Sequence, residues 1–423
     1  MIGIGAIRDD AEGVKRAIAR KGEPPDAVDR ILVADTRRRA LLAEADAAKH
    51  QRNTGSKRIG DLMRDGERDA AERLKLEMGE LGERIKRLDA ELNEVEDAIQ
   101  ADLLLIPNLP HSSVPDGRNE QDNPEVRRWG SPAPVGSAPP HWEIGARLGL
   151  FDLERGAKIA GSGFILYTGK GARLQRAFIG LMLDLADRAG YSEVWPPLLV
   201  NAASARGTGQ LPDKEAQMYV VERDDLYLIP TSEVPVTNMY RDEILPADRL
   251  PIYHCAYSPC FRREAGAAGK DTRGLLRVHQ FDKVEMVKFV HPSTSYDELE
   301  SLTRSAEVVL EALELPYRTV ERCTGDVGFA QAKGYDLEAW GPGVGRYLEV
   351  SSCSNYTDFQ ARRMNLRFRS SADARPELVH TLNGSGLGMS RTYAAFLETH
   401  LQSDGSVRIP AALRPHFGAD AIR

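Results

Sequence analysis

The segment from residue 261 to residue 285 carries the residue types best suited to binding a charged ligand. Arg262 and Glu264 stand two residues apart near its start. A second run alternates with period two through Arg277, His279, Phe281, Lys283 and Glu285. Strand side chains alternate between faces, so two flanking strands would form a hairpin with these residues on one face, where they suit phosphate and a flat base. A solvated hairpin with alternating salt bridges fits the same spacing.

Three segments resemble the motifs of one enzyme family. Residues 261–285 resemble motif 2 of the class II aminoacyl-tRNA synthetases, and their sequence is similar to that of the seryl-tRNA synthetases. They include the glycine-rich cationic loop AGAAGKDTRG at 265–274. PTSEVP at 230–235 resembles the serine-binding signature, and TLNGSGLGMSRTYAAFLE at 381–398 resembles motif 3. The similarity extends from about residue 7 to the C-terminus. It implies ATP-dependent activation of L-serine and its transfer to tRNA(Ser), and to tRNA(Sec) if the organism has one.

The resemblance also implies an ATP site. Its expected residues are Arg262, Arg263, Glu264, Val278, Phe281, Glu349, Val350, Ser351, Ser352 and Arg391. Arg262 matches the arginine that bridges the α-phosphate and the amino-acid carboxylate, while Glu264 contacts the adenine amino group and Phe281 lies under the ring. Arg391 matches the arginine at the γ-phosphate, and a helix start there suits an anion. Arg262, Arg391 and Glu349 are the expected catalytic residues.

Magnesium is the implied metal. Glu349 and Ser352 match the family's pair that holds Mg²⁺ between phosphates. They are three residues apart, so a flat strand would place them on opposite faces. The assignment therefore requires a bulge or a bend between them.

The resemblance places serine against a polar set of residues. These are Thr231, Ser232, Glu233, Glu285 and Ser385. Glu285 matches the acid that takes the ammonium and hydroxyl groups, and Ser385 matches a contact to the side chain. A site built to bond a hydroxyl group rejects analogues that lack it, because its own polar groups are left unpaired. A surface glutamate is the alternative for Glu285, but its shared face with Arg277 and Phe281 argues against that.

A helical hairpin is predicted before these motifs. Residues 27–102 are rich in Ala, Leu, Arg, Glu and Lys and contain no proline. A heptad seam follows steps of four and three through Leu74, Met78, Leu81, Ile85, Leu88, Leu92, Val95 and Ile99. The first half, through Val28, Ile31, Leu42 and Ala45, is less regular, and Gly55, Gly60 and Gly66 suit the turn. We expect two antiparallel helices, and an arm of about 35 residues would reach about 50 Å.

The arm has three possible roles: dimerisation, spacing or tRNA binding. Its first helix and turn carry the cations Arg37, Arg38, Arg39, Lys49, Arg52, Lys57 and Arg58. Its second helix carries the anions Glu72, Glu77, Glu80, Glu83, Glu91, Glu94 and Glu96. Charged residues on a long helix usually form a solvated face, yet cations near the tip could bind phosphate groups. The resemblance favours tRNA, because the family's hairpin reaches along the variable arm of its tRNA.

The predicted fold class is α+β, with an antiparallel coiled-coil hairpin before an antiparallel sheet flanked by helices. We expect a tRNA-binding domain at 1–106, a proline-rich linker at 107–140 and a class II catalytic domain at 141–423. One short helix is expected before Gly22, a helix over 295–315, and strands at 218–221, 226–229 and 347–363. The segment YSEVWPPLLV at 191–200 follows a helix, and Pro197 within it resembles the proline of motif 1. In the family that helix and strand build the dimer interface, so the resemblance implies a homodimer. GSGLG at 384–388 is a poor dinucleotide loop, because no βαβ unit follows.

Composition limits the partners and the compartment. The formal net charge is -7, so nucleic acid would need a local basic patch. The four cysteines lack CxxC spacing, and a zinc site is not expected. No basic start, long apolar stretch or run of roughly 18 apolar residues is present. We expect a cytoplasmic protein without membrane or DNA partners.

Two rival functions remain. A related enzyme could serylate another acceptor, such as a carrier protein, but relatives of that kind lack a long N-terminal arm. An inactive coiled-coil binding protein is the other rival. Retention of the charged motif residues argues against it; these are Arg262, Glu264, Glu285, Glu349 and Arg391.

Overall fold

The computed structural model describes residues 1–213, 216–265 and 273–423. The chain divides into two compact units. The first comprises residues 2–19 and 23–107, and the second comprises residues 1, 20–22 and 108–423. No helix formed by the described residues has both the length and the apolar character needed to cross a membrane.

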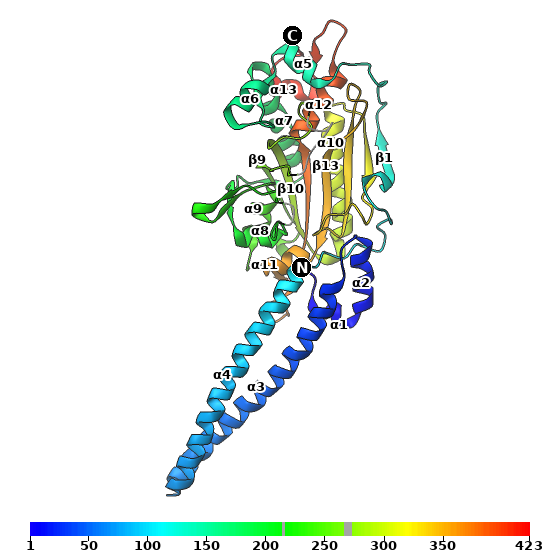
Figure 1. Cartoon of the computed structure of the whole chain (residues 1–423). Helices are drawn as coiled ribbons and strands as arrows, with labels where there is room; N and C mark the ends of the chain where they lie inside the picture. The colour runs from blue at the N-terminus through cyan, green and yellow to red at the C-terminus, as the bar shows by residue number, and fades with distance from the viewer. Residues whose placement is uncertain (214–215, 266–272) are drawn as a thin grey trace. The chain divides into compact units, whose positions relative to one another are not determined.

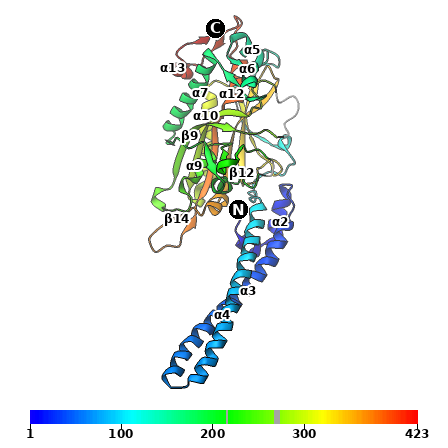
Figure 2. The ribbon, with the colours of Figure 1, turned by 60° about the vertical axis from the view of Figure 1, so that its left-hand side comes forward.

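The N-terminal unit is helical. Its members are α1 (Ile4–Asp9), α2 (Ala11–Arg20), α3 (Asp26–Arg64) and α4 (Arg68–Leu105). The long helices α3 and α4 lie side by side and run in opposite directions (Figures 1 and 2), which confirms the predicted hairpin. The first segment forms two helices instead of the single predicted one, because the chain breaks at Asp10, whose backbone φ of -149° is not helical.

The turn of the hairpin lies later than expected. Only Gly66, at φ +82°, is in the turn between α3 and α4, whereas Gly55 and Gly60 lie within α3. Gly55 instead permits close packing, since a Cβ atom there would meet the Met78 sulfur at 2.2 Å. The inner face of α3 buries Leu41 and not the predicted Leu42. Leu41 precedes the buried Ala45 by four residues and therefore lies on the same face of the helix, whereas Leu42 does not.

The second unit is built on an eight-stranded sheet. Its strands, in spatial order, are β1 (Glu125–Trp129), β11 (Tyr317–Glu321), β12 (Lys333–Gly341), β13 (Arg346–Thr357), β16 (His380–Gly388), β10 (Gln280–Val290), β9 (Ile252–Phe261) and β4 (Ser192–Glu193). All neighbouring pairs are antiparallel except β4 and β9. The proline-rich segment therefore supplies β1, an edge strand of this sheet.

Helices cover one face of the sheet. Helices α7 (Gly169–Arg188) and α10 (Ser295–Ala312) pack against its central strands, as Figure 1 shows. Their apolar faces share one core cluster with Val284 and Met286 of β10. The alternate residues Lys283 and Glu285 consequently point to the opposite face, where the cavity lies.

Smaller elements surround the sheet. The remaining helices are α5 (His141–Leu148), α6 (Leu153–Ala160), α8 (Ala202–Thr208), α9 (Glu233–Thr237), α11 (Phe359–Met364), α12 (Met389–His400) and α13 (Arg414–Phe417). The remaining strands are β2 (Phe151–Asp152), β3 (Leu166–Tyr167), β5 (Leu199–Asn201), β6 (Val220–Val221), β7 (Leu226–Leu228), β8 (Ile244–Pro246), β14 (Arg367–Arg369), β15 (Glu377–Leu378), β17 (Val407–Arg408) and β18 (Ala421–Ile422).

Two segments of the second unit bear on local predictions, and one of those predictions is wrong. The segment 347–363 was expected to be strand throughout, but it turns into α11 after Thr357, which has φ +52° and lies just before Asp358. The glycines at 384–388 lie within β16 and form no loop. Gly384 is required there by packing, because a Cβ atom would meet the Cys353 sulfur at 2.7 Å.

Candidate active site

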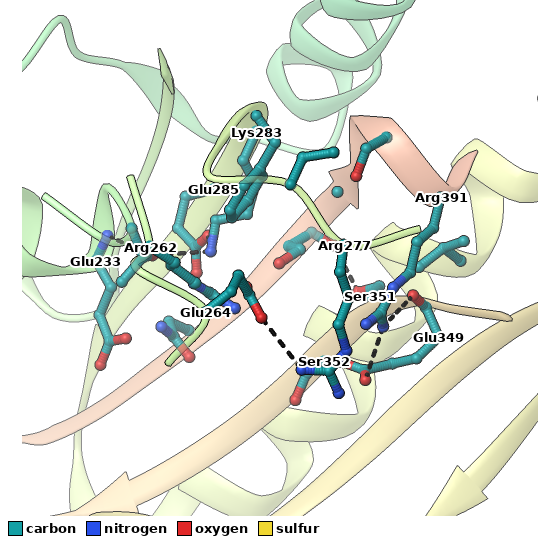
Figure 3. Close-up of a pocket in the computed structure, with 18 of the residues that line it drawn as sticks. Glu233, Arg262, Glu264, Arg277, Lys283, Glu285, Glu349, Ser351, Ser352 and Arg391 are labelled. Atoms are coloured by element: carbon teal, nitrogen blue, oxygen red, sulfur yellow. Dashed lines mark hydrogen bonds and ion pairs between the residues drawn. The ribbon is translucent and has the colours of Figure 1, made fainter. Parts of the chain in front are cut away.

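A polar cavity of about 350 Å³ lies on the open face of the sheet (Figure 3). Thirteen of the fifteen predicted site residues line it. They are Thr231, Glu233, Arg262, Glu264, Val278, Phe281, Glu285, Glu349, Val350, Ser351, Ser352, Ser385 and Arg391. Their segments are spread along the sequence from Thr231 to Arg391. The fold therefore gathers the three motifs into one site.

The predicted hairpin supplies the floor of this cavity. Strand β9 pairs with β10, and Phe281 lies opposite Cys260. The one-face alternation holds for Phe281, Lys283 and Glu285, but it fails before β10 begins. There, His279 stacks on Phe164 at 5.4 Å instead of lining the cavity. Residues 266–272 of the cationic loop lie outside the described residues.

Arg262 presents a cation beside an aromatic plane. Its guanidinium lies 5.1 Å from the centre of the Phe281 ring, and its Nε donates to the Pro230 carbonyl at 3.3 Å. Within the described residues it has no salt-bridge partner, so its charge remains available to an anion. Glu264 is different, because it accepts a 3.1 Å hydrogen bond from Arg277.

A bulge in β13 confirms the bend predicted between Glu349 and Ser352. The pairing with β12 shifts where Ser351 lies opposite Leu337 and Glu349 lies opposite Glu338, which leaves Val350 as the extra residue. This insertion reverses the strand's alternation, so Glu349 and Ser352 reach the same cavity.

The third residue of α12 is Arg391, as expected for a cation at a helix start. Its Nη1 donates to the Glu349 carbonyl and carboxylate, each at 3.1 Å. Its Nε donates to the Leu276 carbonyl at 3.1 Å. Motif 3 is thus joined both to β13 and to the segment that precedes β10 (Figure 3).

A buried charge cluster forms the other end of the cavity. Lys283 makes an ion pair with Glu285 and donates to Thr231 Oγ1 at 2.8 Å. Glu233, 5 % exposed, accepts a 2.6 Å hydrogen bond from Gln360. Burial, together with repulsion from Glu285, raises the pKa of Glu233 to about 7. This carboxyl group consequently changes charge near neutral pH.

Two predicted residues lie beside the cavity and do not line it. Ser232 is fully buried, and its hydroxyl forms a hydrogen bond with the hydroxyl of Ser258 on β9. Arg263 is exposed and donates to the Ala216 carbonyl at 3.2 Å. The strand ends at Phe261, so neighbouring residues 262 and 263 diverge.

Several lining residues were missed by the sequence interpretation. They are Gln210, Leu276, Arg322, Gln331, Tyr356, Asn383, Gly388 and Ser390. Asn383 and Ser390 lie inside the motif 3 segment, so their polar side chains offered a signal. Arg322 and Gln331 lie between β11 and β12, where no pattern in the sequence marks a site.

The comparisons with known proteins agree with this geometry. The seryl-tRNA synthetase N-terminal domain matches residues 1–110, and the tRNA synthetase class II core domain (G, H, P, S and T) matches residues 219–400. The chain is 55 % identical over 426 residues to a serine–tRNA ligase of Geobacillus kaustophilus, with 100 % of both chains covered. It is 52 % identical over 425 residues to that of Thermodesulfovibrio yellowstonii, again with 100 % of both covered.

Solved structures show the same fold. The structure of seryl-tRNA synthetase from Pyrococcus horikoshii complexed with ATP superimposes with a TM-score of 0.95 at 39 % identity, covering 100 % of this chain and 99 % of that one. Cytoplasmic serine–tRNA ligase from Naegleria fowleri in complex with AMP gives 0.90 at 28 % identity, with the same coverage. The predicted fold class is confirmed, and this chain belongs to the seryl-tRNA synthetase family of class II aminoacyl-tRNA synthetases.

Proposed function

We propose that the cavity activates L-serine with ATP and transfers it to tRNA(Ser), and to tRNA(Sec) where the organism has one. The observation that carries this proposal is the presence of two kinds of binding group in one cavity. Arg262 lies over Phe281, and a buried charge cluster surrounds Lys283 and Glu285. The first suits a nucleotide phosphate and base, while the second suits a small zwitterion.

Two displacements make up the reaction. A carboxylate oxygen of serine attacks the α-phosphorus of ATP, and the bond to pyrophosphate breaks. A ribose hydroxyl of the tRNA then attacks the carbonyl carbon of seryl adenylate, with loss of its proton, and AMP leaves. Positioning and charge stabilisation dominate such chemistry. Arg262 would bridge the reacting carboxylate and α-phosphate, and Arg391 would bind the γ-phosphate.

Adenine would lie on Phe281, with Glu264 at its amino group and Val278, Val350 and Ser351 as neighbouring contacts. All five line the cavity. Arg263 points away from it, so its contact with ATP would require movement of its exposed side chain. Ser232 would act on serine only through its buried hydroxyl pair with Ser258.

Serine would be bound at the charged end. Glu285 would take the ammonium and hydroxyl groups, with Thr231, Glu233 and Ser385 around it. Glu285 is 1 % exposed, so a ligand without a hydroxyl group would leave this carboxylate desolvated and without that hydrogen-bond partner. This would separate serine from alanine, which has no hydroxyl group.

The Mg²⁺ site proposed at Glu349 and Ser352 has suitable ligands. Both side chains offer oxygen, which this cation prefers. The Ser352 hydroxyl oxygen is buried and makes no hydrogen bond within the part of the chain that the structure describes. When bound, Mg²⁺ would supply positive charge against the phosphate oxygens. The chain's own part is to hold Glu349 and Ser352 on one face through the β13 bulge.

The outer parts of the chain complete the proposal. Residues 27–102, within a tRNA-binding domain at 1–106, would bind the tRNA, with 107–140 as the connection to a catalytic domain at 141–423. Trp195, which is 77 % exposed, and Leu199 would form a homodimer contact. The four cysteines are free and buried, which fits the reducing cytoplasm.

Amino-acid-dependent exchange between pyrophosphate and ATP tests the proposed function. Exchange is expected with serine and ATP, with far lower rates for alanine, and threonine should be poor for lack of space. Equal rates with serine and alanine would contradict the assignment. Subsequent charging of tRNA(Ser), compared with a carrier protein, identifies the acceptor.

A further inference from the structure

Lys21 places its ammonium group among backbone carbonyls next to the cavity wall. Its Nζ lies within hydrogen-bonding distance of four carbonyl oxygens: Asn108 at 3.1 Å, Gly328 at 2.8 Å, Phe329 at 3.3 Å and Gln331 at 3.0 Å. Lys21 stands between α2 and α3, but it belongs to the same compact unit as those carbonyls. Three of the four belong to one short segment, 328–331.

Asn108 holds the same segment from the other end of the helical hairpin. It follows α4 and is 5 % exposed. Its Nδ2 donates to the carbonyls of Ala330 at 3.0 Å and Tyr356 at 2.8 Å. Its backbone N–H donates to the Phe329 carbonyl at 2.9 Å. Segment 328–331 is therefore contacted both by Lys21, just before the helical hairpin, and by Asn108, just after it.

Segment 328–331 forms part of the cavity wall. Gln331 lines the cavity, and its Oε1 accepts from Arg322 Nη1 at 3.1 Å and from the Gly328 N–H at 2.8 Å. Tyr356 lines the cavity as well; its hydroxyl donates to Asn383 Oδ1 at 2.9 Å and lies near Gln331 and Glu233. Glu233 belongs to the charged end of the cavity, so the segment adjoins the place proposed for serine.

Few regular backbone contacts fix this segment. It lies between the end of β11 at Glu321 and the start of β12 at Lys333, so no strand pairing sets its position. An edge-to-face contact at 5.9 Å holds Phe329 against Phe359. The side-chain hydrogen bonds of Lys21 and Asn108 therefore help to fix the position of this segment. The Phe329 contact would keep the segment folded if one of these hydrogen bonds were lost.

We propose that Lys21 and Asn108 are positioning residues for serine binding. They hold segment 328–331, and with it Gln331, against the cavity from the two chain ends of the helical hairpin. This inference rests on the proposed function of the cavity. It adds two residues that would touch neither substrate and that act through Gln331.

Lys21→Met tests the first residue, because methionine keeps an unbranched stem and removes the ammonium group. We expect the KM for serine in pyrophosphate exchange to rise about tenfold, with kcat changed less than about threefold, since positional loss weakens binding. Lys21→Arg restores donors and should recover most of the affinity. Lys15→Met is the matched control, since Lys15 is on α2 and pairs with Asp29 at 2.6 Å. A serine KM in Lys21→Met equal to that of Lys15→Met would overturn the proposal.

A double-mutant cycle tests the route through Gln331. In a Gln331→Ala background, Lys21→Met and Asn108→Ala should each add less than about twofold to the serine KM, because coupled residues are not additive. If either change still raised the serine KM tenfold in that background, its effect would not act through Gln331. If the wild-type chain shows no serine-dependent exchange, the proposed function itself fails. If the wild type exchanges normally and the variants do too, only this inference fails.

Discussion

Arginines in the cavity differ in how their charge is compensated. Arg277 pairs with Glu264 and Arg391 with Glu349, both at 3.1 Å, while Arg322 contacts Asp326 at 3.1 Å. Among the described residues, Arg262 alone of these four has no carboxylate partner. A cation held by an aromatic ring and a carbonyl is ready to stabilise negative charge that develops during a reaction.

Replacement of Arg262 should therefore affect the chemical step. We expect Arg262→Ala to lower the rate of serine-dependent pyrophosphate exchange by about 100- to 1000-fold, because such donors contribute that much at developing charge. Circular dichroism should show an unchanged fold. Arg223→Ala, at an exposed position between β6 and β7 and outside the cavity, is the control. Near wild-type exchange in Arg262→Ala would refute its placement at the α-phosphate.

The raised pKa of Glu233 predicts a pH dependence of serine binding. Burial disfavours its charged form, so the carboxyl group is protonated below its pKa of about 7. An ammonium ligand favours the ionised form, and binding below pH 7 must therefore release a proton. We expect the KM for serine to fall as pH rises toward 7, by up to about tenfold per pH unit, and then to level.

Measurement of the serine KM in exchange assays from about pH 5.5 to 8.5 checks this. Glu233→Gln removes the titration and should flatten the profile below pH 7, while the KM for ATP serves as the internal control. Parallel profiles for wild type and variant would assign the dependence to another group.

At the scale of elements, the hairpin neutralises much of its own charge. Ion pairs join α3 to α4 at Arg30 and Asp102, Arg37 and Glu91, and Lys49 and Asp89. Some of the cations expected to bind the tRNA therefore already form ion pairs within the arm. Near the turn, however, Arg52, Lys57 and Arg58 are exposed and have no ion pair among the described residues. These three remain available for phosphate.

Neutralising this exposed group should weaken tRNA binding. For Arg52→Gln, Lys57→Gln and Arg58→Gln combined, we expect a flatter plot of log affinity against log salt, with about one unit lost per phosphate contact. The triple change Lys75→Gln, Arg84→Gln and Lys86→Gln on α4 removes the same charge from paired positions. Filter binding at several salt concentrations compares them. Equal slopes in the two triple variants would show that location near the turn is irrelevant.

At the scale of the whole molecule, the division into two units predicts separable functions. Replacement of residues 27–102 by a short loop, with Lys21 and Asn108 retained, should leave serine-dependent exchange almost unchanged. Charging of tRNA should fall strongly, because the arm and its phosphate contacts are gone. Exchange and charging measured on the same preparation test this. Normal charging by the armless protein would make the arm a spacer or a dimerisation device.

The exposed apolar surface around motif 1 predicts a dimer. Trp195 is 77 % exposed in the single chain, and Leu199 is 42 % exposed nearby in sequence. Light scattering should give twice 46.7 kDa for the wild type and a value near 46.7 kDa for Trp195→Glu. Leu76→Glu changes an equally exposed residue on the arm and should stay dimeric. A monomeric wild-type protein would contradict the predicted homodimer.

The sequence by itself determined the arm and most of the cavity. Heptad spacing is a local property, so the seam from Leu74 to Ile99 predicted α4 directly. The three motif segments supplied nine lining residues and the segment 349–352 supplied four more, because each keeps its polar side chains close together in sequence. The bulge in β13 was predicted from the shared role that the resemblance gives Glu349 and Ser352, together with their spacing of three.

Only the tertiary structure decided which further residues join them. Arg322 and Gln331 reach the cavity from the connection between β11 and β12, whose position no local pattern encodes. Arg263 turns away beyond the end of β9, and His279 turns away before β10 begins, although period two had placed His279 on the binding face. Lys21 and Asn108 are 87 residues apart, yet they hold one segment. Long-range contacts depend on how strands and chain ends assemble, and spacing along the chain carries no record of that assembly.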